Sequence, residues 1–254
     1  MHKKNIYLIL FLLLNTLTFA KDLQLEKIFK DNQVEGTIVI ESYNTKKIDI
    51  YNDKRASMFL SPASTFKIPH TLIALNEGLI TSDSLILWDK TDKGMKAWNK
   101  NQTLESAFKV SCVWCYKEFA SKIDKNKYKS YLEELNYGNK IIGDNITDFW
   151  LDESLKLTAY GQIEFLKRLY KNDLPFKIEN IDALKEIMID EKTNDYIIRA
   201  KTGWEGKYGW YVGYIETKND VYFFATNINT KSKDDLAKRK KITLEALKIK
   251  GVIK

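Results

Sequence analysis

The sequence of 254 residues contains little histidine, with only His2 and His70. A Ser-His-Asp hydrolase needs a histidine base, and protein zinc sites commonly use several histidines. Because His2 lies in a segment that we expect to be removed, the sequence argues against both kinds of site. Glycine (11 residues) and proline (3 residues) are also few, and 44% of the residues are hydrophobic. This composition excludes collagen-like, low-complexity and largely disordered chains.

Arginine is scarce among the basic residues. Lys and Arg total 41 against 34 Asp and Glu, which gives a formal charge of +7, but only four of the 41 are Arg. Nucleic-acid binding commonly uses Arg side chains or a dense basic stripe, whereas here Lys is scattered among acidic residues. We therefore expect no nucleic-acid partner. The four are Arg55, Arg168, Arg199 and Arg239.

Only one long hydrophobic run occurs, at the N-terminus. Lys3 and Lys4 precede the apolar stretch 6–14, and a small residue, Ala20, ends the segment. This pattern is typical of a secretory signal peptide over 1–20, with a mature chain that begins at Lys21. The apolar stretch is shorter than the ~20 residues that a membrane span needs. The sequence thus predicts export, without stable membrane association after cleavage.

The only two cysteines, Cys112 and Cys115, form a C-x-x-C pair. Such a pair can be a redox motif, but that motif normally opens a helix in a thioredoxin-type βαβ unit, and no such unit surrounds it. The sequence favours two small apolar residues one helical turn apart, able at most to form a local disulfide. It leaves open whether they are bonded.

Strand patterns lie at both ends of the chain and helical patterns fill the middle. We therefore predict an α+β fold (an α/β sandwich), in which one antiparallel sheet from both termini is flanked by the N- and C-terminal helices. A helical lobe at about 80–171 would be inserted into a single catalytic domain, 21–254, with the site in the cleft between sheet and lobe. Strands are predicted at 36–43, 46–51, 196–202, 209–216 and 221–228, and helices at 64–77, 159–170, 181–189 and 234–249.

A first chemical motif is Ser64-Thr65-Phe66-Lys67, which opens a predicted helix. Residues i and i+3 share a helix face, so the Lys67 amine would lie beside the Ser64 hydroxyl. A Ser hydroxyl is a poor nucleophile until a base takes its proton. The run Ser106-Ala107-Phe108-Lys109 has the same pattern, and we interpret it as chance on a surface helix.

Two further motifs follow in the chain. Ser111-Cys112-Val113 lies within the helical region, and Lys201-Thr202-Gly203 ends a predicted strand. A strand that carries K-T-G can present a cation and a hydroxyl along one edge, and we expect the small Gly203 to let a substrate approach closely. Together, the three motifs in this order are typical of penicillin-recognising serine enzymes.

With these residues in place, the chain from about 36 to 249 resembles a class D (oxacillinase-type) β-lactamase. The stretch 61–69 (SPASTFKIP) is similar to that family's consensus, and 234–239 (DDLAKR) is similar to the start of its last helix. The resemblance also covers Tyr137-Gly138-Asn139, Phe149-Trp150-Leu151 and Trp98. It implies the fold shared by serine β-lactamases and penicillin-binding transpeptidases.

The resemblance also implies residue roles. Ser64 would be the nucleophile and Ser111 a proton relay. An ordinary Lys is protonated at neutral pH, but burial lowers its pKa. Lys67 would then react with CO₂ to become the N-carboxylated general base, with the Trp150 indole as its hydrogen-bond donor. Substrate would contact Lys201, Thr202, Gly203, Trp204 and Arg239, the apolar residues Val113 and Leu151, and Trp98 at the pocket edge; Phe66 would help to line the lysine, and His70 would have no catalytic role.

The implied activity is hydrolysis of the β-lactam amide of penicillin-type antibiotics in the periplasm, which confers resistance. We expect no cofactor besides CO₂ or bicarbonate, no metal, a small-molecule β-lactam as the partner, and a monomer or homodimer. The class A pattern fails because Leu132 stands where its acidic residue belongs, and the shortage of His excludes a metallo-β-lactamase. Two alternatives stay open: a β-lactam-sensing penicillin-binding module and a D,D-peptidase.

Two features depart from the family pattern. Only the five residues Trp204 to Tyr208 separate K-T-G from Gly209, and this short loop leaves activity on carbapenems open. The second departure is Cys at 112 and 115, where small or apolar residues are commoner.

Overall fold

The structure is a computed structural model, and it describes residues 22–254. The signal peptide expected over 1–20 lies outside the described residues. Within the described part of the chain, no helix is both long enough and apolar enough to cross a lipid bilayer.

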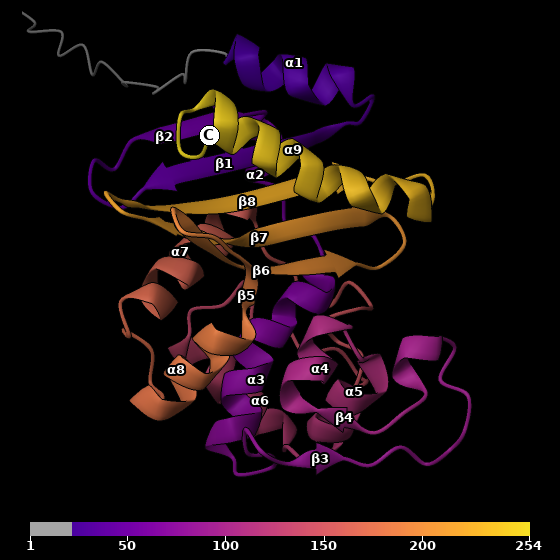
Figure 1. Cartoon of the computed structure of the whole chain (residues 1–254). Coiled ribbons are helices and arrows are strands. Elements are labelled where there is room, and N and C mark those ends of the chain that lie inside the picture. The colour runs from indigo at the N-terminus through magenta and orange to yellow at the C-terminus, as the bar shows by residue number, and fades with distance from the viewer. Residues whose placement is uncertain (1–21) are drawn as a thin grey trace, which may run out of the picture.

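A six-stranded sheet forms the centre of the molecule, and each pair of neighbouring strands is antiparallel. The N-terminal strands join the C-terminal ones where β1 pairs with β8 (Figure 1). This confirms the predicted α+β fold with one sheet built from both ends of the chain. The order across the sheet is β2 (Ile48–Tyr51), β1 (Gly36–Ser42), β8 (Val221–Asn229), β7 (Tyr208–Thr217), β6 (Tyr196–Trp204) and β5 (Ile189–Lys192).

Two helices from opposite ends of the chain, α1 (Leu23–Asp31) and α9 (Leu236–Ile249), cover one face of the sheet (Figure 1). The side chain of Asp22 caps α1 by accepting from the backbone N–H groups of Gln24 and Leu25. The apolar sides of both helices bury against the sheet in one core. That core contains Leu25, Ile28, Phe29, Ile38, Ile40, Phe224, Ile242, Ala246 and Leu247.

The other face of the sheet carries the remaining helices (Figure 1). Helix α7 (Ala159–Tyr170), which has the predicted bounds 159–170, packs directly on β8, β1 and β7. Helix α3 (Lys67–Asn76) lies deeper and packs against α5 and α8. The other elements are α2 (Asp53–Ala56), α4 (Leu104–Lys109), α5 (Val113–Ser121), α6 (Lys125–Glu134), α8 (Ile178–Ile187), the two-residue strands β3 (Leu85–Ile86) and β4 (Gln102–Thr103), and the 3₁₀ turns η1 (Ala63–Phe66), η2 (Lys96–Trp98) and η3 (Lys233–Asp235).

Strand β5 is a difference from the sequence prediction. A helix is predicted over 181–189, but α8 ends at Ile187 and an edge strand begins at Ile189. The strand sequence, Ile-Asp-Glu-Lys, lacks the β-branched and aromatic run that marks a strand. Its extended conformation comes from pairing with β6, where Ile189 lies opposite Arg199. A tertiary contact therefore overrides the local preference.

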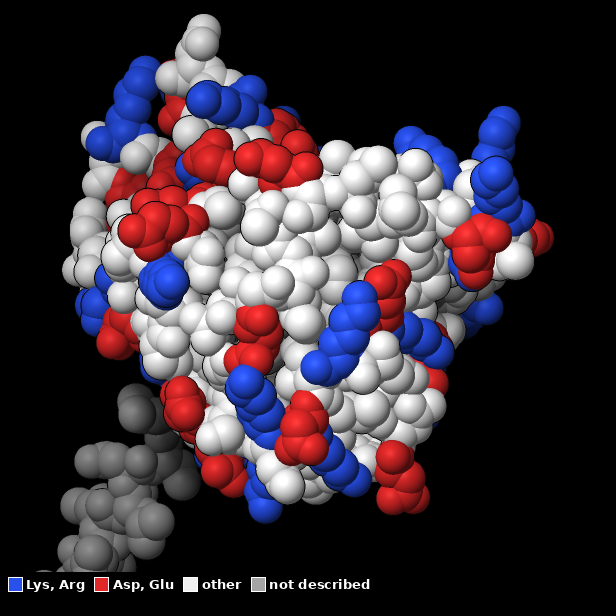
Figure 2. All heavy atoms as spheres, turned by 90° about the horizontal axis from the view of Figure 1, so that it is seen from below, with Lys and Arg blue, Asp and Glu red and all other residues white. Residues whose placement is uncertain are grey.

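The molecular surface in Figure 2 carries both signs of charge. On the face that this view shows, Lys and Arg side chains are interspersed with Asp and Glu over a largely uncharged ground. A dense basic stripe of the kind that tracks a nucleic-acid backbone is not seen on that face.

Candidate active site

Ser64 lies in the tight 3₁₀ turn η1, directly before α3. Ala63 begins this turn with a φ of 47°, and the Thr65 hydroxyl donates to the Pro62 carbonyl at 2.7 Å. The turn brings the Lys67 Nζ to 3.3 Å from the Ser64 Oγ. The structure therefore places the hydroxyl beside the amine, on a 3₁₀ turn rather than on the first turn of the predicted α-helix.

Lys67 is fully buried, with no exposed surface. The Nζ lies 4.6 Å from the centre of the Tyr116 ring, and Phe66 stacks on Trp150 beside it, with ring centroids 5.8 Å apart. Burial disfavours the charged form of the amine and lowers the pKa of Lys67 to about 7. A large share of the amine is therefore neutral near neutral pH.

Trp150 is buried and stacks on Phe66, the residue before this lysine, and its indole Nε1–H has no hydrogen-bond partner among the described residues. Its backbone carbonyl, in contrast, accepts from the Ser61 hydroxyl at 3.0 Å. Buried donors in folded proteins are rarely left unpaired, so each exception calls for a ligand, a water or a modification. This orphan donor fits an additional acceptor group beside Lys67.

His70 is also fully buried, one helical turn after Phe66. Its Nε2 shares a hydrogen bond with the Tyr128 hydroxyl at 2.6 Å, and its ring packs edge-on against Trp150 at 5.1 Å. Burial, together with the nearby Lys67 charge, lowers the pKa of His70 well below its ordinary value. The ring is therefore neutral, and its contact with the Trp150 indole helps to hold that indole in place.

Ser111 and Lys201 meet across the site. Ser111 lies in the turn between α4 and α5 with a φ of 53°, and its Oγ accepts from the Lys201 Nζ at 2.5 Å. Lys201 is 4% exposed. Burial, followed by the positive charges of Lys67 and Arg239, lowers the pKa of Lys201 well below its ordinary value.

Gly203, at the end of K-T-G, is constrained by the protein itself. An added Cβ would lie 2.8 Å from the Pro62 carbonyl oxygen and 3.0 Å from the Thr65 methyl. From the sequence, this glycine is expected to let a substrate approach closely. In the structure the space beside it is filled by the serine turn η1, which packs on β6. The glycine thus sets the spacing between the strand and the nucleophile.

Arg239, near the start of α9, reaches the same strand end. Its Nη1 donates to the Gly203 carbonyl at 2.6 Å, while its buried Nε has no partner among residues 22–254. Burial lowers the pKa of Arg239 to about 10, so it remains a cation. The neighbouring Trp204 donates its indole N–H to the Thr230 hydroxyl at 3.0 Å. Arg239 can therefore offer hydrogen bonds to an anion at the end of β6.

The remaining predicted residues lie on several different elements. The Trp98 indole donates to the Val110 carbonyl at 3.0 Å, which fixes it beside the Ser111 turn. Val113 and Leu151 are partly buried, and Leu151 packs against the main core. Thr202 lies next to Lys201 on β6, opposite Tyr211 of β7. The structure thus brings the three motifs together around Ser64.

The second S-x-x-K pattern is not a site. The Ser106 hydroxyl donates to Gln102 at 2.6 Å and caps α4, and the Lys109 amine reaches the Ile189 carbonyl. The two side chains do not meet, in agreement with the interpretation of this pattern as chance.

A cavity of about 1040 Å³ lies elsewhere, between α1, the start of β1 and the start of α9. It is lined by residues such as Arg55, Tyr51 and Lys238, and none of the residues described in this subsection as part of the site belongs to it. The volume of a cavity is therefore no guide to the active site in this protein. The site is located by the Ser, Lys and Arg side chains that converge on one another.

Comparison with known proteins decides the family. Residues 30–248 match the family model described as the penicillin binding protein transpeptidase domain. β-Lactamase OXA-20 of Pseudomonas aeruginosa is 44% identical over 220 residues, which cover 85% of this chain and 83% of that protein. β-Lactamase OXA-48 of Klebsiella pneumoniae is 38% identical over 230 residues, covering 89% and 87%. The crystal structure of FUS-1 (OXA-85), a class D β-lactamase from Fusobacterium nucleatum subsp. polymorphum, matches with a TM-score of 0.89 at 38% identity, covering 92% of this chain and all of that one.

This chain belongs to the class D β-lactamases. The finding confirms the family that the sequence resemblance indicated and, with it, the class of serine β-lactamase. The fold agrees as well, because the match to that solved class D structure extends over 92% of this chain.

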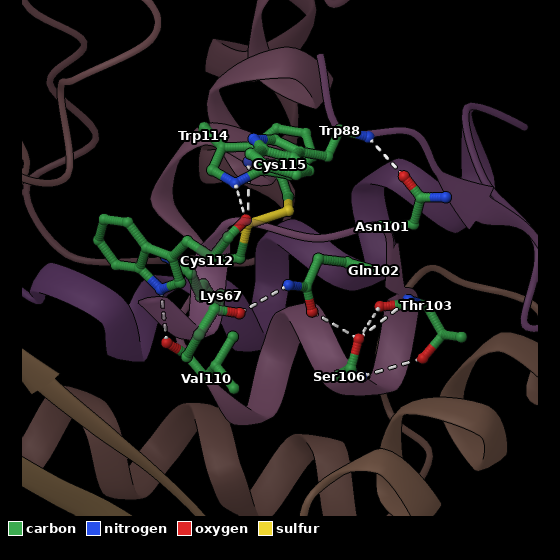
Figure 3. Close-up of a disulfide and its surroundings, with 12 residues drawn as sticks. Lys67, Trp88, Asn101, Gln102, Thr103, Ser106, Val110, Cys112, Trp114 and Cys115 are labelled. Carbon is green, nitrogen blue, oxygen red and sulfur yellow. Dashed lines mark hydrogen bonds between the residues drawn. A yellow bond between two sulfur atoms is a disulfide. The ribbon is translucent and has the colours of Figure 1, made fainter. Parts of the chain in front are cut away.

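This class D β-lactamase carries a disulfide inside its second motif. Cys112 and Cys115 are bonded, with Cα atoms 5.5 Å apart, and both are fully buried. Figure 3 draws the bond at the start of α5, with Lys67 among the residues around it. The sequence analysis left open whether the pair is bonded, and the structure gives the local disulfide.

Two aromatic residues of the site were not found from the sequence. Tyr116 packs over the Lys67 amine, and the Trp114 indole donates to the Trp98 carbonyl at 3.1 Å. Both follow Val113 on α5, and Tyr116 lies one helical turn after it. Helical spacing from the second motif could have indicated Tyr116, because residues i and i+3 share a face.

Proposed function

We propose that this enzyme hydrolyses the β-lactam amide of penicillin-type antibiotics through a covalent acyl intermediate on Ser64, and so confers resistance. The observation that carries the proposal is the contact of 3.3 Å between the Ser64 hydroxyl and a fully buried Lys67 amine. Attack of Ser64 on the lactam carbonyl forms the acyl ester and breaks the amide C–N bond, and water then releases the acid.

Lys67 fits the N-carboxylation that is general in this family. A neutral amine reacts with CO₂ to give a carbamate and a proton, and burial supplies the neutral amine. The unpaired Trp150 Nε1–H is a donor for the new oxygens. When present, the carbamate supplies an anionic oxygen base next to Ser64. That base suits removal of the proton from the Ser64 hydroxyl and, later, from water.

The other site residues have proposed roles that follow from their positions. Ser111, bonded to Lys201, would pass a proton to the leaving nitrogen. The backbone N–H groups of Ser64 and Trp204 would form the oxyanion hole. Lys201, Thr202 and Arg239 would hold the substrate carboxylate, because the two basic side chains donate only to uncharged oxygens, the Ser111 hydroxyl and the Gly203 carbonyl. Val113, Leu151 and Trp98 would contact the apolar parts of the drug.

Steady-state hydrolysis of nitrocefin, with and without bicarbonate, tests the proposal. We expect many turnovers per enzyme molecule, faster with bicarbonate, and none for Ser64→Ala or Lys67→Ala. Lys109→Ala is the matched control, because it removes the lysine of the unpaired S-x-x-K pattern and should keep full activity.

Other outcomes separate the alternatives. A single burst of one equivalent of product without turnover would indicate the sensing module. Slow cleavage of D-alanyl peptides with no β-lactam turnover would indicate the D,D-peptidase. Absence of any acylation of Ser64 would contradict all three.

We also propose that the chain acts after export to the periplasm. The support is the basic and apolar pattern of residues 3–20 and the family to which the chain belongs. Expression in a Gram-negative host, followed by fractionation and N-terminal sequencing, should give periplasmic enzyme that begins at Lys21. Enzyme that keeps Met1 and stays with the membrane fraction would contradict the proposal.

A further inference from the structure

The Cys112–Cys115 disulfide occupies an unusual place for a structural cross-link. Cys112 stands between Ser111 and Val113 of the second motif, and Cys115 lies in the first turn of α5. Both sulfur-bearing residues are fully buried in the core that also contains Phe66, Tyr116 and Trp150. The bond therefore lies in the core close to the site, with Lys67 among the residues around it (Figure 3).

The start of α5, which the bond spans, has weak hydrogen bonds of its own. Ser111 has a φ of 53°, in the left-handed region that non-glycine residues rarely adopt. Cys112 is the N-cap of α5, yet sulfur is a weak acceptor, and the bond from the Cys115 N–H is 3.3 Å long. The first backbone bond of α5, from Tyr116 N–H to the Cys112 carbonyl, is 3.5 Å long. A covalent link across this turn compensates for these weak bonds.

The turn holds both halves of the catalytic machinery. On one side, the Ser111 Oγ accepts from Lys201 at 2.5 Å. On the other side, Tyr116, next to Cys115, places its ring 4.6 Å from the Lys67 Nζ and bonds its hydroxyl to Thr71 at 2.7 Å. A shift of this turn would therefore move the Ser111 relay and open the apolar cover of Lys67 together.

The bond contributes little to the stability of the whole fold. The chain-entropy contribution of a disulfide increases with the length of the loop that it closes, and here the cysteines are only three positions apart. A local role explains its position better than a global one.

We propose that the Cys112–Cys115 disulfide is a positioning group of this enzyme, which holds Ser111 against Lys201 and Tyr116 over Lys67, so that full activity needs the oxidised form. The inference rests on the proposed function and deepens it. A dithiol reductant would break the S–S bond, with one electron and one proton going to each sulfur, while the dithiol itself becomes a disulfide. The two thiols would leave the start of α5 held by the 3.5 Å bond from Tyr116 N–H and the weak bond to the Cys112 sulfur, although Cys112 N–H would keep its 2.8 Å bond to the Ala107 carbonyl.

The test compares wild-type enzyme folded in oxidising buffer or with dithiothreitol, its redox state being checked by counting thiols in denaturant. The variant Cys112→Ser/Cys115→Ala removes the bond and keeps a good N-cap, because Ser is a preferred capping residue. For reduced wild type and for the variant, we expect kcat for nitrocefin to fall about tenfold or more, since small misplacements of catalytic groups are costly. KM should change less than kcat, and half-maximal activity should need more bicarbonate.

The controls are unusually direct. The chain has only two cysteines, so dithiothreitol should have no effect on the double variant. Active-site titration with a slow acylating β-lactam gives the folded fraction, to which each kcat is normalised. Equal normalised kcat and equal bicarbonate dependence in all three proteins would overturn the inference. Inactivity of the oxidised wild type would instead count against the proposed function.

Discussion

At the scale of single residues, the site is made of basic side chains whose chemical properties depend on their being buried away from water. Lys67 becomes a usable amine only because no water reaches it, and Lys201 and Arg239 keep hydrogen bonds to uncharged oxygens. Burial of three basic groups near one another costs folding free energy. It also creates a site that attracts anions, and the carboxylate of a penicillin is an anion.

The pH dependence of activity follows from the pKa of Lys67, which burial lowers from 10.5 to about 7. Only the neutral amine reacts with CO₂, and its fraction increases as the pH rises through 7. Carbamate formation then releases a further proton, so at a fixed, limiting concentration of dissolved CO₂ kcat should rise from pH 6 to pH 8 and beyond, with an inflection near 7 where the slope of log kcat against pH falls from about two to about one. The measurement is nitrocefin turnover in buffers matched for dissolved CO₂ rather than for total bicarbonate. An inflection near 10 would mean that the lysine is hydrated in solution.

Trp150→Phe isolates the orphan indole N–H from the packing of the ring. Phe keeps an aromatic side chain against Phe66 and His70 but removes the donor, so the carbamate loses a hydrogen bond worth about 1.5–3 kcal/mol for a charged acceptor. We expect carbamate occupancy at a given CO₂ concentration to fall about tenfold or more. The readout is the carbamate signal in ¹³C NMR with labelled bicarbonate. A full signal in Trp150→Phe would show that another group holds the carbamate.

At the scale of elements, the site depends on how closely strand β6 approaches the serine turn η1. Gly203 allows that contact, since a side chain there would meet the Pro62 carbonyl at 2.8 Å. The distance between Ser64 and Lys201 is therefore set by packing between a strand and a turn that are far apart in sequence. No residue of either motif determines it alone.

Gly203→Ala should push η1 away from β6. We expect a loss of about 1–3 kcal/mol in the free energy of unfolding from overpacking and a decrease in kcat of about 10²-fold from displacement of Ser64. Gly209→Ala is the matched control, because its added carbon meets a Thr230 methyl at 3.2 Å rather than a backbone carbonyl. Urea unfolding and nitrocefin kinetics give the two quantities. Equal kinetics in both variants would mean that the strand does not set the position of the serine.

The sequence carries local information on these elements but little on their contacts. The bounds of α7 and the sheet strands of both termini follow from hydrophobic spacing, and Ser64 and Lys67 are neighbours along one turn. The packing of Gly203 on Pro62, the ring of Tyr116 over Lys67 and the edge strand β5 all join segments distant in sequence. Spacing rules describe one element at a time, so they could at most place Tyr116 on the same face of α5 as Val113 and could not show what that face contacts.

At the scale of the whole molecule, the first and last helices of residues 22–254 lie together on the outer face of the sheet. Helices α1 and α9 share one core, and Lys250 pairs with Asp22 across them. Only α9 also reaches the site, because Arg239 near its start donates to the Gly203 carbonyl. The same outer core therefore has one half that only stabilises the fold and one half that also positions a substrate-binding group.

A pair of equal truncations separates these two functions. Ile28 of α1 and Ile242 of α9 are both buried, and Ile242 lies one helical turn after Arg239. Ile→Ala at either position should lower the free energy of unfolding by about 2–5 kcal/mol, as for other large-to-small core substitutions. Ile242→Ala should also raise KM for penicillins about fivefold through a loosened Arg239, whereas Ile28→Ala should leave KM unchanged because α1 holds no site residue. Urea unfolding measures the first effect and initial rates on folded enzyme measure the second. If the two variants shift KM equally, the carboxylate contact does not depend on the seating of α9, and Arg239 must be held by β6 alone.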